Sequence, residues 1–324
     1  MNELSKTQGH WGIFTTVGGL AEPRARGAGA GQGAKTSDFA EEFSCHANEF
    51  RVSIRPVPEW LAIILLGIIE GITEFLPISS TGHLLIAEKW LPRQTDLFNI
   101  VIQSAAVLAV IPLFKERVKR MLAAGHDLVA RDYALKVMVA FGITGVGGLI
   151  LEKLHFKLPE KLFPVGMALL IGGVAILLIE SRVNDRRWKH EVTWRLAVVF
   201  GLGQLVAAIF PGASRSGTTI MLALLFGMSR PAATEFSFLV GIPTMLAAGG
   251  YKIFKALRHD APSENWSMVV LGTVVSGIVS FIVVRWLLRY VQSHTFIGFG
   301  WYRIAVGGII LVGGLFGLFG PAFE

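Results

Sequence analysis

The sequence predicts an all-α, polytopic membrane protein made of two inverted repeats, each with a re-entrant helical hairpin and three transmembrane spans. The chain of 324 residues is 52% hydrophobic and only 16% charged, and its mean hydropathy is +0.57. Apolar runs separated by short charged loops fill the chain from Pro56 onward, and two of them are broken by polar, proline-containing motifs. Soluble domains carry about 25% charged residues, so this composition argues against a soluble enzyme, a disordered chain or a nucleic-acid binder.

Residues 1–55 differ in composition from the rest of the chain. The stretch AEPRARGAGAGQGAKTSDFAEEFS is rich in Gly, Ala and charged residues and has no apolar period. Such a segment buries too little apolar surface to offset the entropy that it would lose on ordering. We therefore expect a disordered N-terminal extension over 1–55 and a single membrane domain over 56–324.

The first repeat is expected over residues 57–179. A helix needs about 20 residues to cross about 30 Å of hydrocarbon, and the run 79–90 is too short to cross alone. It begins within the polar break PISSTG, and loop backbone at membrane depth is tolerated only where it lines a cavity or is buried in protein. The pattern predicts a re-entrant hairpin over 57–90, followed by spans over 98–114, 136–151 and 163–179.

The second repeat is expected over residues 194–319 and has the same order of elements. The short run 218–228 follows the break PGASRSG, which predicts a hairpin over 194–228 and then spans over 233–251, 268–288 and 297–319. Aligning Pro77 with Pro211 pairs Gly67 with Gly201, Glu70 with Gln204, and Ser80 with Ser214. Because three spans separate the hairpins, the second hairpin must enter from the opposite face of the membrane.

Basic residues divide unequally between the two sets of loops. The loops 115–136 and 180–195, together with Arg230, Arg285 and Arg289, hold fourteen Lys and Arg residues, against eight on the other side. The positive-inside rule places the first set in the cytoplasm. Both termini and the opening of the first hairpin then face the outside, and topology explains the net charge of +7.

Two carboxylates interrupt the apolar helix of the first hairpin. Glu70 and Glu74 are four residues apart in IIEGITEFLP and share one helix face. Ionisable groups at membrane depth are costly and usually functional, and two adjacent carboxylates repel unless a cation or a shared proton lies between them. Hydrogen bonding to neighbouring helices is the structural alternative, but it does not explain two charges in one apolar helix.

The motif PISSTGH directly follows these carboxylates. Its hydroxyls belong to Ser79, Ser80 and Thr81, and His83 lies at the start of the next half-helix. Helix N-termini bind anions, serine can act as a nucleophile and histidine can transfer a proton. We expect one of these hydroxyls and the His83 imidazole to be catalytic and the other hydroxyls among Ser79, Ser80 and Thr81 to bind substrate, whereas the alternative is a capped turn with an interfacial imidazole.

The second hairpin carries the motif PGASRSGTT. Arg215 presents a fork of donors suited to phosphate, and we expect hydroxyls beside it to bind substrate, namely those of Ser214, Ser216 and Thr218. The alternative is an ion pair between Arg215 and Glu70 or Glu74, which can coexist with phosphate binding. Carboxylates, hydroxyls, an imidazole and an arginine at breaks in apolar helices fit hydrolysis of a phosphate ester or anhydride on a lipid.

At this point the chain resembles a known family. EGITEFLPISSTGH and PGASRSGTT look like the two signature motifs of the undecaprenyl-diphosphatase, or bacitracin-resistance, family, and the resemblance covers residues 57–319. It implies hydrolysis of undecaprenyl diphosphate to undecaprenyl phosphate and inorganic phosphate, which recycles the lipid carrier for cell-wall synthesis and confers bacitracin resistance. It also implies a multi-pass protein of the bacterial inner membrane whose active site faces the periplasm.

The resemblance implies residue roles and a cofactor as well. The family's catalytic residues correspond to Glu70, Glu74, Ser80, His83 and Arg215, and its activity needs a divalent cation, Mg²⁺ or Ca²⁺, for which we expect Glu70 and Glu74 as ligands. The expected partners are a polyprenyl diphosphate and membrane lipids, with no nucleic acid. The sequence leaves open whether Ser80 or His83 attacks phosphorus, which prenyl length is preferred, and whether the protein forms a homodimer.

A lipid or anion transporter is the competing function. Inverted repeats with broken helices are common among transporters, and the same glutamates and arginine could bind cargo or protons without a reaction. Transport, however, does not need the combination of a hydroxyl nucleophile and an imidazole that PISSTGH supplies.

Overall fold

A computed structural model describes residues 57–123, 125, 127–154, 161–183, 191–258 and 265–320. These residues belong to one unit of the chain, Arg55–Glu324. The disordered extension expected over 1–55 lies outside the described residues and stays a prediction.

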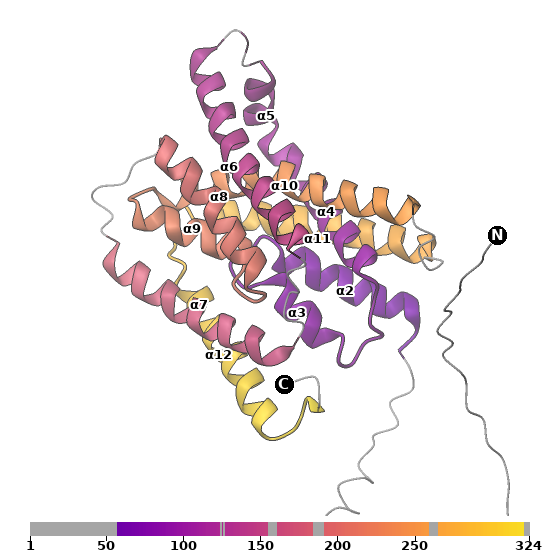
Figure 1. Ribbon diagram of the computed structural model, residues 1–324. Coiled ribbons are helices and arrows are strands. Elements are labelled where there is room, and N and C mark those ends of the chain that lie inside the picture. The colour runs from indigo at the N-terminus through magenta and orange to yellow at the C-terminus, as the bar shows by residue number, and fades with distance from the viewer. Residues whose placement is uncertain are drawn as a thin grey trace, which may run out of the picture. The chain divides into compact units, whose positions relative to one another are not determined.

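The elements of the described residues are helices, which confirms the all-α expectation (Figure 1). In the first half these are α2 (Glu59–Thr73), α3 (Ser80–Ala87), α4 (Asp96–Val110), the 3₁₀ turn η1 (Ile111–Phe114), α5 (Lys115–Leu122), α6 (Leu128–Lys153) and α7 (Leu162–Arg182). In the second half they are α8 (Trp194–Ile209), α9 (Arg215–Leu225), α10 (Arg230–Arg258), α11 (Trp266–Tyr290) and α12 (Ile297–Leu315).

Six helical segments among the described residues are long and apolar enough to cross a membrane. They are Asp96–Leu122, Leu128–Lys153, Leu162–Arg182, Arg230–Ala256, Trp266–Tyr290 and Ile297–Leu315. The helices of the two expected hairpins are shorter, with 15 and 8 residues in α2 and α3 and 16 and 11 in α8 and α9. The chain is therefore a multi-pass membrane protein in which two pairs of short helices accompany six spans.

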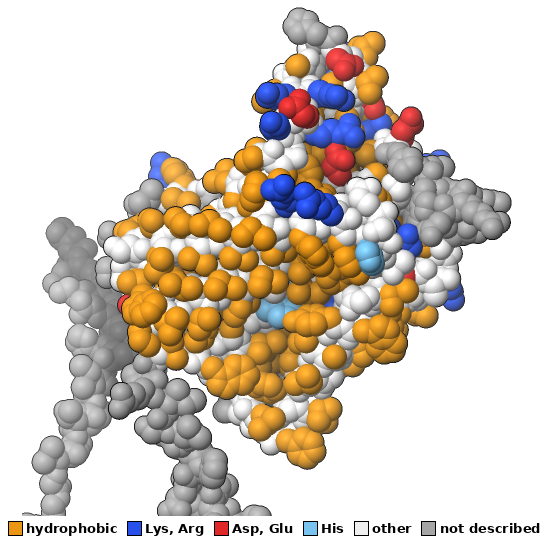
Figure 2. Space-filling view, turned by 180° about the vertical axis from the view of Figure 1, so that it is seen from behind, with side chains coloured by type: hydrophobic (Ala, Val, Ile, Leu, Met, Phe, Trp, Pro, Cys, Tyr) orange, Lys and Arg blue, Asp and Glu red, His pale blue; other side chains and the backbone are white. Residues whose placement is uncertain are grey.

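The surface of the helices agrees with this assignment. Figure 2 shows hydrophobic side chains covering most of one face, while Lys, Arg, Asp and Glu gather at its upper end. Exposed tryptophans lie near several helix ends, as expected of anchors at the membrane–water interface: Trp60, Trp90, Trp194, Trp266 and Trp301. A soluble protein would not leave so much apolar surface uncovered.

The first helix of each hairpin packs against a span of the other half. A Cβ added at Gly67 of α2 would lie 3.0 Å from the carbonyl oxygen of Gly272 in α11. A Cβ added at Gly201 of α8 would lie 2.9 Å from the carbonyl oxygen of Ala140 in α6. The two glycines that the sequence pairs thus permit equivalent close contacts, which supports two structural copies. That the copies are inverted in the membrane stays a prediction.

The loops between the hairpin helices are residues 74–79 in the first hairpin and 210–214 in the second, and they differ from the predicted alignment in one detail. Ser79 and Ser214 are the residues that precede α3 and α9, and they adopt the same unusual conformation, with φ of 74° and 68°. The counterpart of Ser214 is therefore Ser79, and the predicted pairing with Ser80 is wrong by one position. The cause is one extra residue between Pro211 and its serine compared with the loop after Pro77.

Candidate active site

Both loops present a serine that caps the helix after it. The hydroxyl oxygen of Ser79 accepts a hydrogen bond from the backbone N–H of Gly82 at 3.3 Å, and that of Ser214 from Gly217 at 3.1 Å. A non-glycine residue at positive φ costs of order 1–3 kcal/mol and persists where surrounding structure holds it in place. A capping serine at positive φ thus ends both loops, and the residue after it, Ser80 or Arg215, lines a shared cavity.

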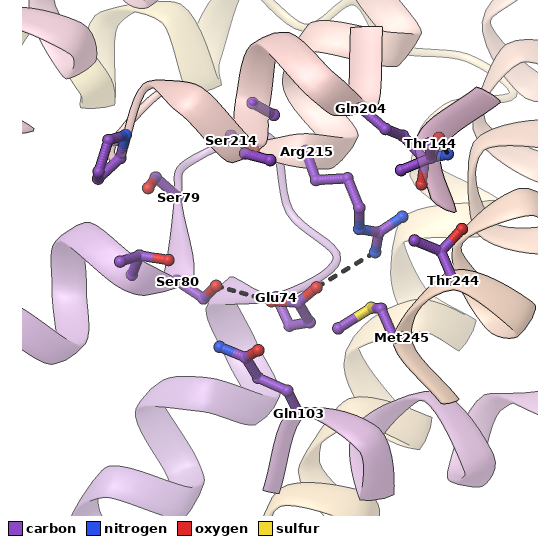
Figure 3. Close-up of a pocket in the computed structure, with 15 residues that line it drawn as sticks. Glu74, Ser79, Ser80, Gln103, Thr144, Gln204, Ser214, Arg215, Thr244 and Met245 are labelled. Atoms are coloured by element: carbon purple, nitrogen blue, oxygen red, sulfur yellow. Dashed lines mark hydrogen bonds and ion pairs between the residues drawn. The ribbon is translucent and has the colours of Figure 1, made fainter. Parts of the chain in front are cut away.

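A chain of hydrogen bonds joins the two loops across this cavity (Figure 3). The Ser80 hydroxyl donates to Oε2 of Glu74 at 2.7 Å, and Nη2 of Arg215 donates to the other oxygen, Oε1, at 3.2 Å. Ser80 and Glu74 are buried and the Arg215 side chain is 15% exposed. The expected ion pair between Arg215 and a glutamate of the first hairpin is confirmed for Glu74.

Arg215 retains donor capacity beyond this ion pair. Nη1 donates to the backbone carbonyl of Ser237 at 3.4 Å, and Nε is buried with no hydrogen-bond partner among the described residues. The guanidinium lies against Gly241, where a Cβ would come within 2.2 Å of Nη1. An anion entering the cavity would therefore meet donors that the protein does not satisfy internally, which is a suitable site for a phosphate group.

Glu70 lies one helical turn before Glu74 and is fully buried. Neither of its carboxylate oxygens has a hydrogen-bond partner within the described part of the chain. Such a group needs a cation or a proton, so it fits the expected divalent cation. Glu74 already accepts bonds from Ser80 and Arg215, and the described residues contain no cluster of three or more potential metal ligands. The cation would therefore depend on substrate oxygens and water to complete its coordination, as Mg²⁺ commonly does.

The cavity has a volume of about 210 Å³ and is lined by both hairpins and by α4, α6 and α10. Opposite Ser80 it contains an amide and a hydroxyl that bond each other, with Nε2 of Gln204 donating to Thr144 at 2.9 Å (Figure 3). Gln103, Thr244 and Met245 also line it, although the sequence analysis did not select them. Their signal in the sequence is weak, because single polar or sulfur-containing residues within spans are common.

Adjacent cavities connect this site to a charged region of the surface. A cavity of about 390 Å³ shares Thr81, Gln103 and Pro211 with the first, and a cavity of about 350 Å³ shares the same three residues. The cavity of about 350 Å³ is also lined by charged residues, namely Glu88, Arg93, Asp96 and Lys252. Polar ligands can thus reach the Ser80–Glu74–Arg215 group from one end of the protein.

The five residues expected to bind substrate fall into two groups. Ser79, Thr81 and Ser214 line the cavity. The hydroxyl of Ser216 donates to the Leu76 carbonyl at 3.0 Å, and that of Thr218 to the Ala213 carbonyl at 3.4 Å. The structure therefore uses Ser216 and Thr218 to hold loop backbone, although their expected role in binding stays untested.

Of the predicted catalytic residues, Glu70 and His83 do not line the cavity with Ser80, Glu74 and Arg215. His83 lies in α3, three residues after Ser80. Its ring Nδ1 lies 2.7 Å from the Ser79 carbonyl oxygen, and its Nε2 lies 2.8 Å from the hydroxyl of Tyr302 in α12. The imidazole thus contacts the back of the loop that carries Ser80.

Arg303 of α12 joins both loops and was missed by the sequence analysis. It is 1% exposed, and its guanidinium donates to five backbone carbonyls, those of Pro77, Ala168, Leu169, Gly212 and Ala213, at 3.0–3.4 Å. An arginine within an apolar span is a signal for such a role. Its partners could not be inferred, because backbone carbonyls leave no trace in the sequence.

Comparison with known proteins gives a consistent result over most of the chain. Residues 63–309 match the family model described as bacitracin resistance protein BacA. Curated relatives named undecaprenyl-diphosphatase include one from Xylella fastidiosa that is 50% identical over 78% of this chain and 98% of its own length. A relative from Rhizobium leguminosarum bv. trifolii is 49% identical over 81% of this chain and 100% of its own. One from Rhizobium johnstonii is 48% identical over 78% and 96%.

Proposed function

The chain belongs to the bacitracin resistance protein BacA family, and on this premise we propose how its buried site acts on the substrate that its relatives' name describes. The protein is an undecaprenyl-diphosphate phosphatase, a membrane hydrolase of cell-wall synthesis. It converts undecaprenyl diphosphate to undecaprenyl phosphate and inorganic phosphate. The observation that carries the mechanism is the hydrogen-bonded chain from Ser80 through Glu74 to Arg215 at the junction of two hairpins.

Ser80 is the nucleophile in this proposal, with Glu74 as its base. The Ser80 oxygen attacks the terminal phosphorus while its proton passes to Oε2 of Glu74, which lies 2.7 Å away. The bond from that phosphorus to the bridging oxygen breaks, and undecaprenyl phosphate leaves with the electron pair. Water then attacks the phosphorus of the phosphoserine, the bond from phosphorus to the Ser80 oxygen breaks, and Glu74 returns its proton to that oxygen. Inorganic phosphate leaves with both hydrogens of the water.

Arg215 stabilises the charge that moves in both steps. Its guanidinium lines the cavity and is the proposed donor to non-bridging phosphate oxygens. Donors that are fixed before the reaction lower the barrier because they need no reorganisation. Binding the terminal phosphate would draw Arg215 away from Glu74, which leaves the carboxylate more basic toward Ser80.

Glu70 and Glu74 are the proposed ligands of the divalent cation. The support is the buried Glu70 carboxylate, both of whose oxygens lack a partner among the described residues. When bound, the cation would neutralise charge on the diphosphate as the bridging bond breaks. Glu70 would also be kept ionised by the cation in an apolar surrounding that otherwise penalises its charge.

A transporter reading has less support from the site. A hydroxyl that donates to a buried carboxylate is the arrangement expected of a nucleophile with its base, and moving a lipid or an anion across the membrane needs neither. The transporter alternative therefore does not account for the hydrogen bond between Ser80 and Glu74.

The orientation of the protein is proposed from its charges. With the loop that contains α5 in the cytoplasm, the site opens toward the periplasmic side of a bacterial inner membrane. In a Cys45→Ser background, a single cysteine at Lys119 should resist a membrane-impermeant thiol reagent in intact cells, whereas one at Lys89 should react. Both positions are exposed, so the opposite pattern would reverse the orientation.

The purified full-length protein should release phosphate from undecaprenyl diphosphate in detergent with Mg²⁺ present. Ser80→Ala should abolish measurable turnover because it removes the nucleophile, and loss of a nucleophile typically costs ~10⁶-fold in related chemistry. Ser181→Ala is the matched control, since among the described residues the Ser181 hydroxyl hydrogen-bonds only to the carbonyl of Leu178 within its own helix. Parent-like activity of Ser80→Ala, or no phosphate release by the parent, would overturn the proposal.

A further inference from the structure

The His83 imidazole is held from both sides. Nδ1 is 2.7 Å from the carbonyl oxygen of Ser79, and Nε2 is 2.8 Å from the hydroxyl of Tyr302. The two rings are stacked, with centroids 5.6 Å apart and planes inclined by 8°. Tyr302 lies 219 residues further along the chain, so this contact joins the last described helix to the first loop.

The two hydrogen-bond partners of His83 determine which of its ring nitrogens carries a hydrogen. A carbonyl oxygen can only accept, so Nδ1 of His83 must carry the hydrogen of that bond. In the neutral ring Nε2 then has the only lone pair, and the Tyr302 hydroxyl donates to it. The imidazole therefore has no free lone pair with which to attack phosphorus or remove a proton from Ser80.

The carbonyl that His83 binds belongs to the strained residue of the loop. Ser79 has φ of 74°, and its carbonyl oxygen also accepts the backbone N–H of His83 at 3.3 Å. The next residue is Ser80. A shift of the Ser79 carbonyl would therefore move the hydroxyl that must reach Glu74.

The second hairpin has a similar contact at the position that corresponds to His83. Thr218 lies four residues after Ser214, as His83 lies four residues after Ser79, and its hydroxyl donates to the carbonyl of Ala213 at 3.4 Å. In both hairpins the side chain at this place thus bonds to a carbonyl of the loop behind it. Among the described residues, only the side chain in the first hairpin, His83, has a second hydrogen-bond partner on α12, the Tyr302 hydroxyl.

We propose that Tyr302 and His83 form a positioning pair for the hydrolysis, in which the Tyr302 hydroxyl fixes the ring that holds the Ser79–Ser80 loop. Neither residue touches the phosphate or exchanges a proton with it. The inference rests on the proposed function for its kinetic consequence, and on the hydrogen bonds alone for its structural one.

Tyr302→Phe is the central variant, because it removes one oxygen and keeps the stacked ring. Losing one positioning hydrogen bond should lower kcat about tenfold and leave KM for undecaprenyl diphosphate within about twofold. The control is Tyr290→Phe. Tyr290 also stacks on a histidine, His294, with centroids 4.5 Å apart, but its hydroxyl donates to the Thr295 carbonyl and not to a residue of either hairpin, so the variant should keep parent kinetics.

A conservative replacement of the ring separates positioning from catalysis. His83→Asn keeps an N–H donor near the place of Nδ1 and should retain more than tenfold higher kcat than His83→Ala. Adding Tyr302→Phe to His83→Asn should cause no further loss, since the amide cannot reach the tyrosine. A His83→Asn variant as inactive as His83→Ala, or a phosphohistidine trapped during turnover, would overturn the proposal.

A spectroscopic measurement tests the contact without any turnover. Nitrogen-15 NMR of histidine-labelled protein in detergent, with His83→Asn to assign the signal, should show His83 protonated on Nδ1 in the parent. Tyr302→Phe should convert it to a mixture of tautomers. A parent signal protonated on Nε2 would overturn the inference even if phosphate release is normal. If the parent releases no phosphate but the NMR result holds, the proposed function fails and the His83–Tyr302 contact stands.

Discussion

The two hairpins have the same backbone conformation at their loops but present different side chains to the cavity. In each, a serine at positive φ caps the second helix, and the next residue faces the common cavity. That next residue is the hydroxyl-bearing Ser80 in the first hairpin and the cationic Arg215 in the second. The proposed nucleophile, Ser80, and the proposed phosphate-binding residue, Arg215, thus occupy equivalent positions after the positive-φ serines, so the same loop conformation occurs in both halves of the site.

The first helices of the hairpins differ in the same way. Glu70 is buried with both carboxylate oxygens unpartnered among the described residues, whereas its counterpart Gln204 donates to Thr144. The amide nitrogen is bonded within the protein, although Oε1 of Gln204 also lacks a partner among the described residues. We therefore expect Gln204 to stabilise the fold at the place where Glu70 is proposed to bind the cation.

After the loss of Ser80, replacing Arg215 of the second hairpin should have the largest effect. Arg215→Ala should lower the rate of phosphate release by about 10²- to 10³-fold, the usual cost of losing a fixed donor to an anionic transition state. Arg215→Lys should stay well below the parent, because an ammonium group cannot reproduce the guanidinium fork. Exposed Arg285→Ala serves as the control. A lysine variant at nearly the parent rate would place phosphate recognition elsewhere.

Neutralising the carboxylates of the first hairpin should come next. Glu70→Gln and Glu74→Gln keep the shape of the side chains and remove the charge, and each should lower hydrolysis at least about tenfold. Both should also raise the Mg²⁺ concentration needed for half-maximal rate, which a titration after chelation would measure. Because Gln204 shows that an amide is accommodated in the second hairpin, these variants should fold. Unchanged rate and metal requirement would make the pair structural.

The smallest effect should come from the glycines that let the hairpins pack. Gly67→Ala and Gly201→Ala should each lower the free energy of unfolding by about 1–3 kcal/mol, since a Cβ would press on a backbone carbonyl at 3.0 Å or 2.9 Å. Similar losses would support equivalent packing of the two copies. Gly142→Ala in α6 has open space around its Cβ and should be neutral in the same thermal unfolding measurement. A loss confined to one hairpin would show that the copies have diverged in packing.

Much of the architecture could be predicted because it depends on composition and length. Apolar runs of sufficient length predict spans, and PISSTGH and PGASRSGTT mark the breaks where Ser80 and Arg215 lie. The exact pairing of Ser79 with Ser214 could not be predicted, because one additional loop residue leaves no signal in an alignment anchored on proline. The identification of Glu74 as the partner of both Ser80 and Arg215 also required the fold.

The surroundings of His83 show why side-chain direction is hard to infer. An imidazole beside a serine in a polar motif predicts catalysis, but the partner that turns the ring away lies on α12. Arg303 was missed for a similar reason, since its partners are carbonyl groups that every residue has. Periodicity reports which helix face is apolar, and it does not report which polar groups bind backbone.

The bonds of Arg303 also set the order in which the protein can become active during its synthesis. Its Nη1 binds the carbonyl of Pro77, which the ribosome produces 226 residues earlier. At about 5–20 residues per second, the first loop waits roughly 10–50 s for the helix that secures it. Until α12 enters the membrane, the loops that precede Ser80 and Arg215 lack their shared hydrogen bonds to Arg303. We therefore expect a chain that ends before residue 303 to lack the hydrogen bonds that hold both loops, and to be inactive.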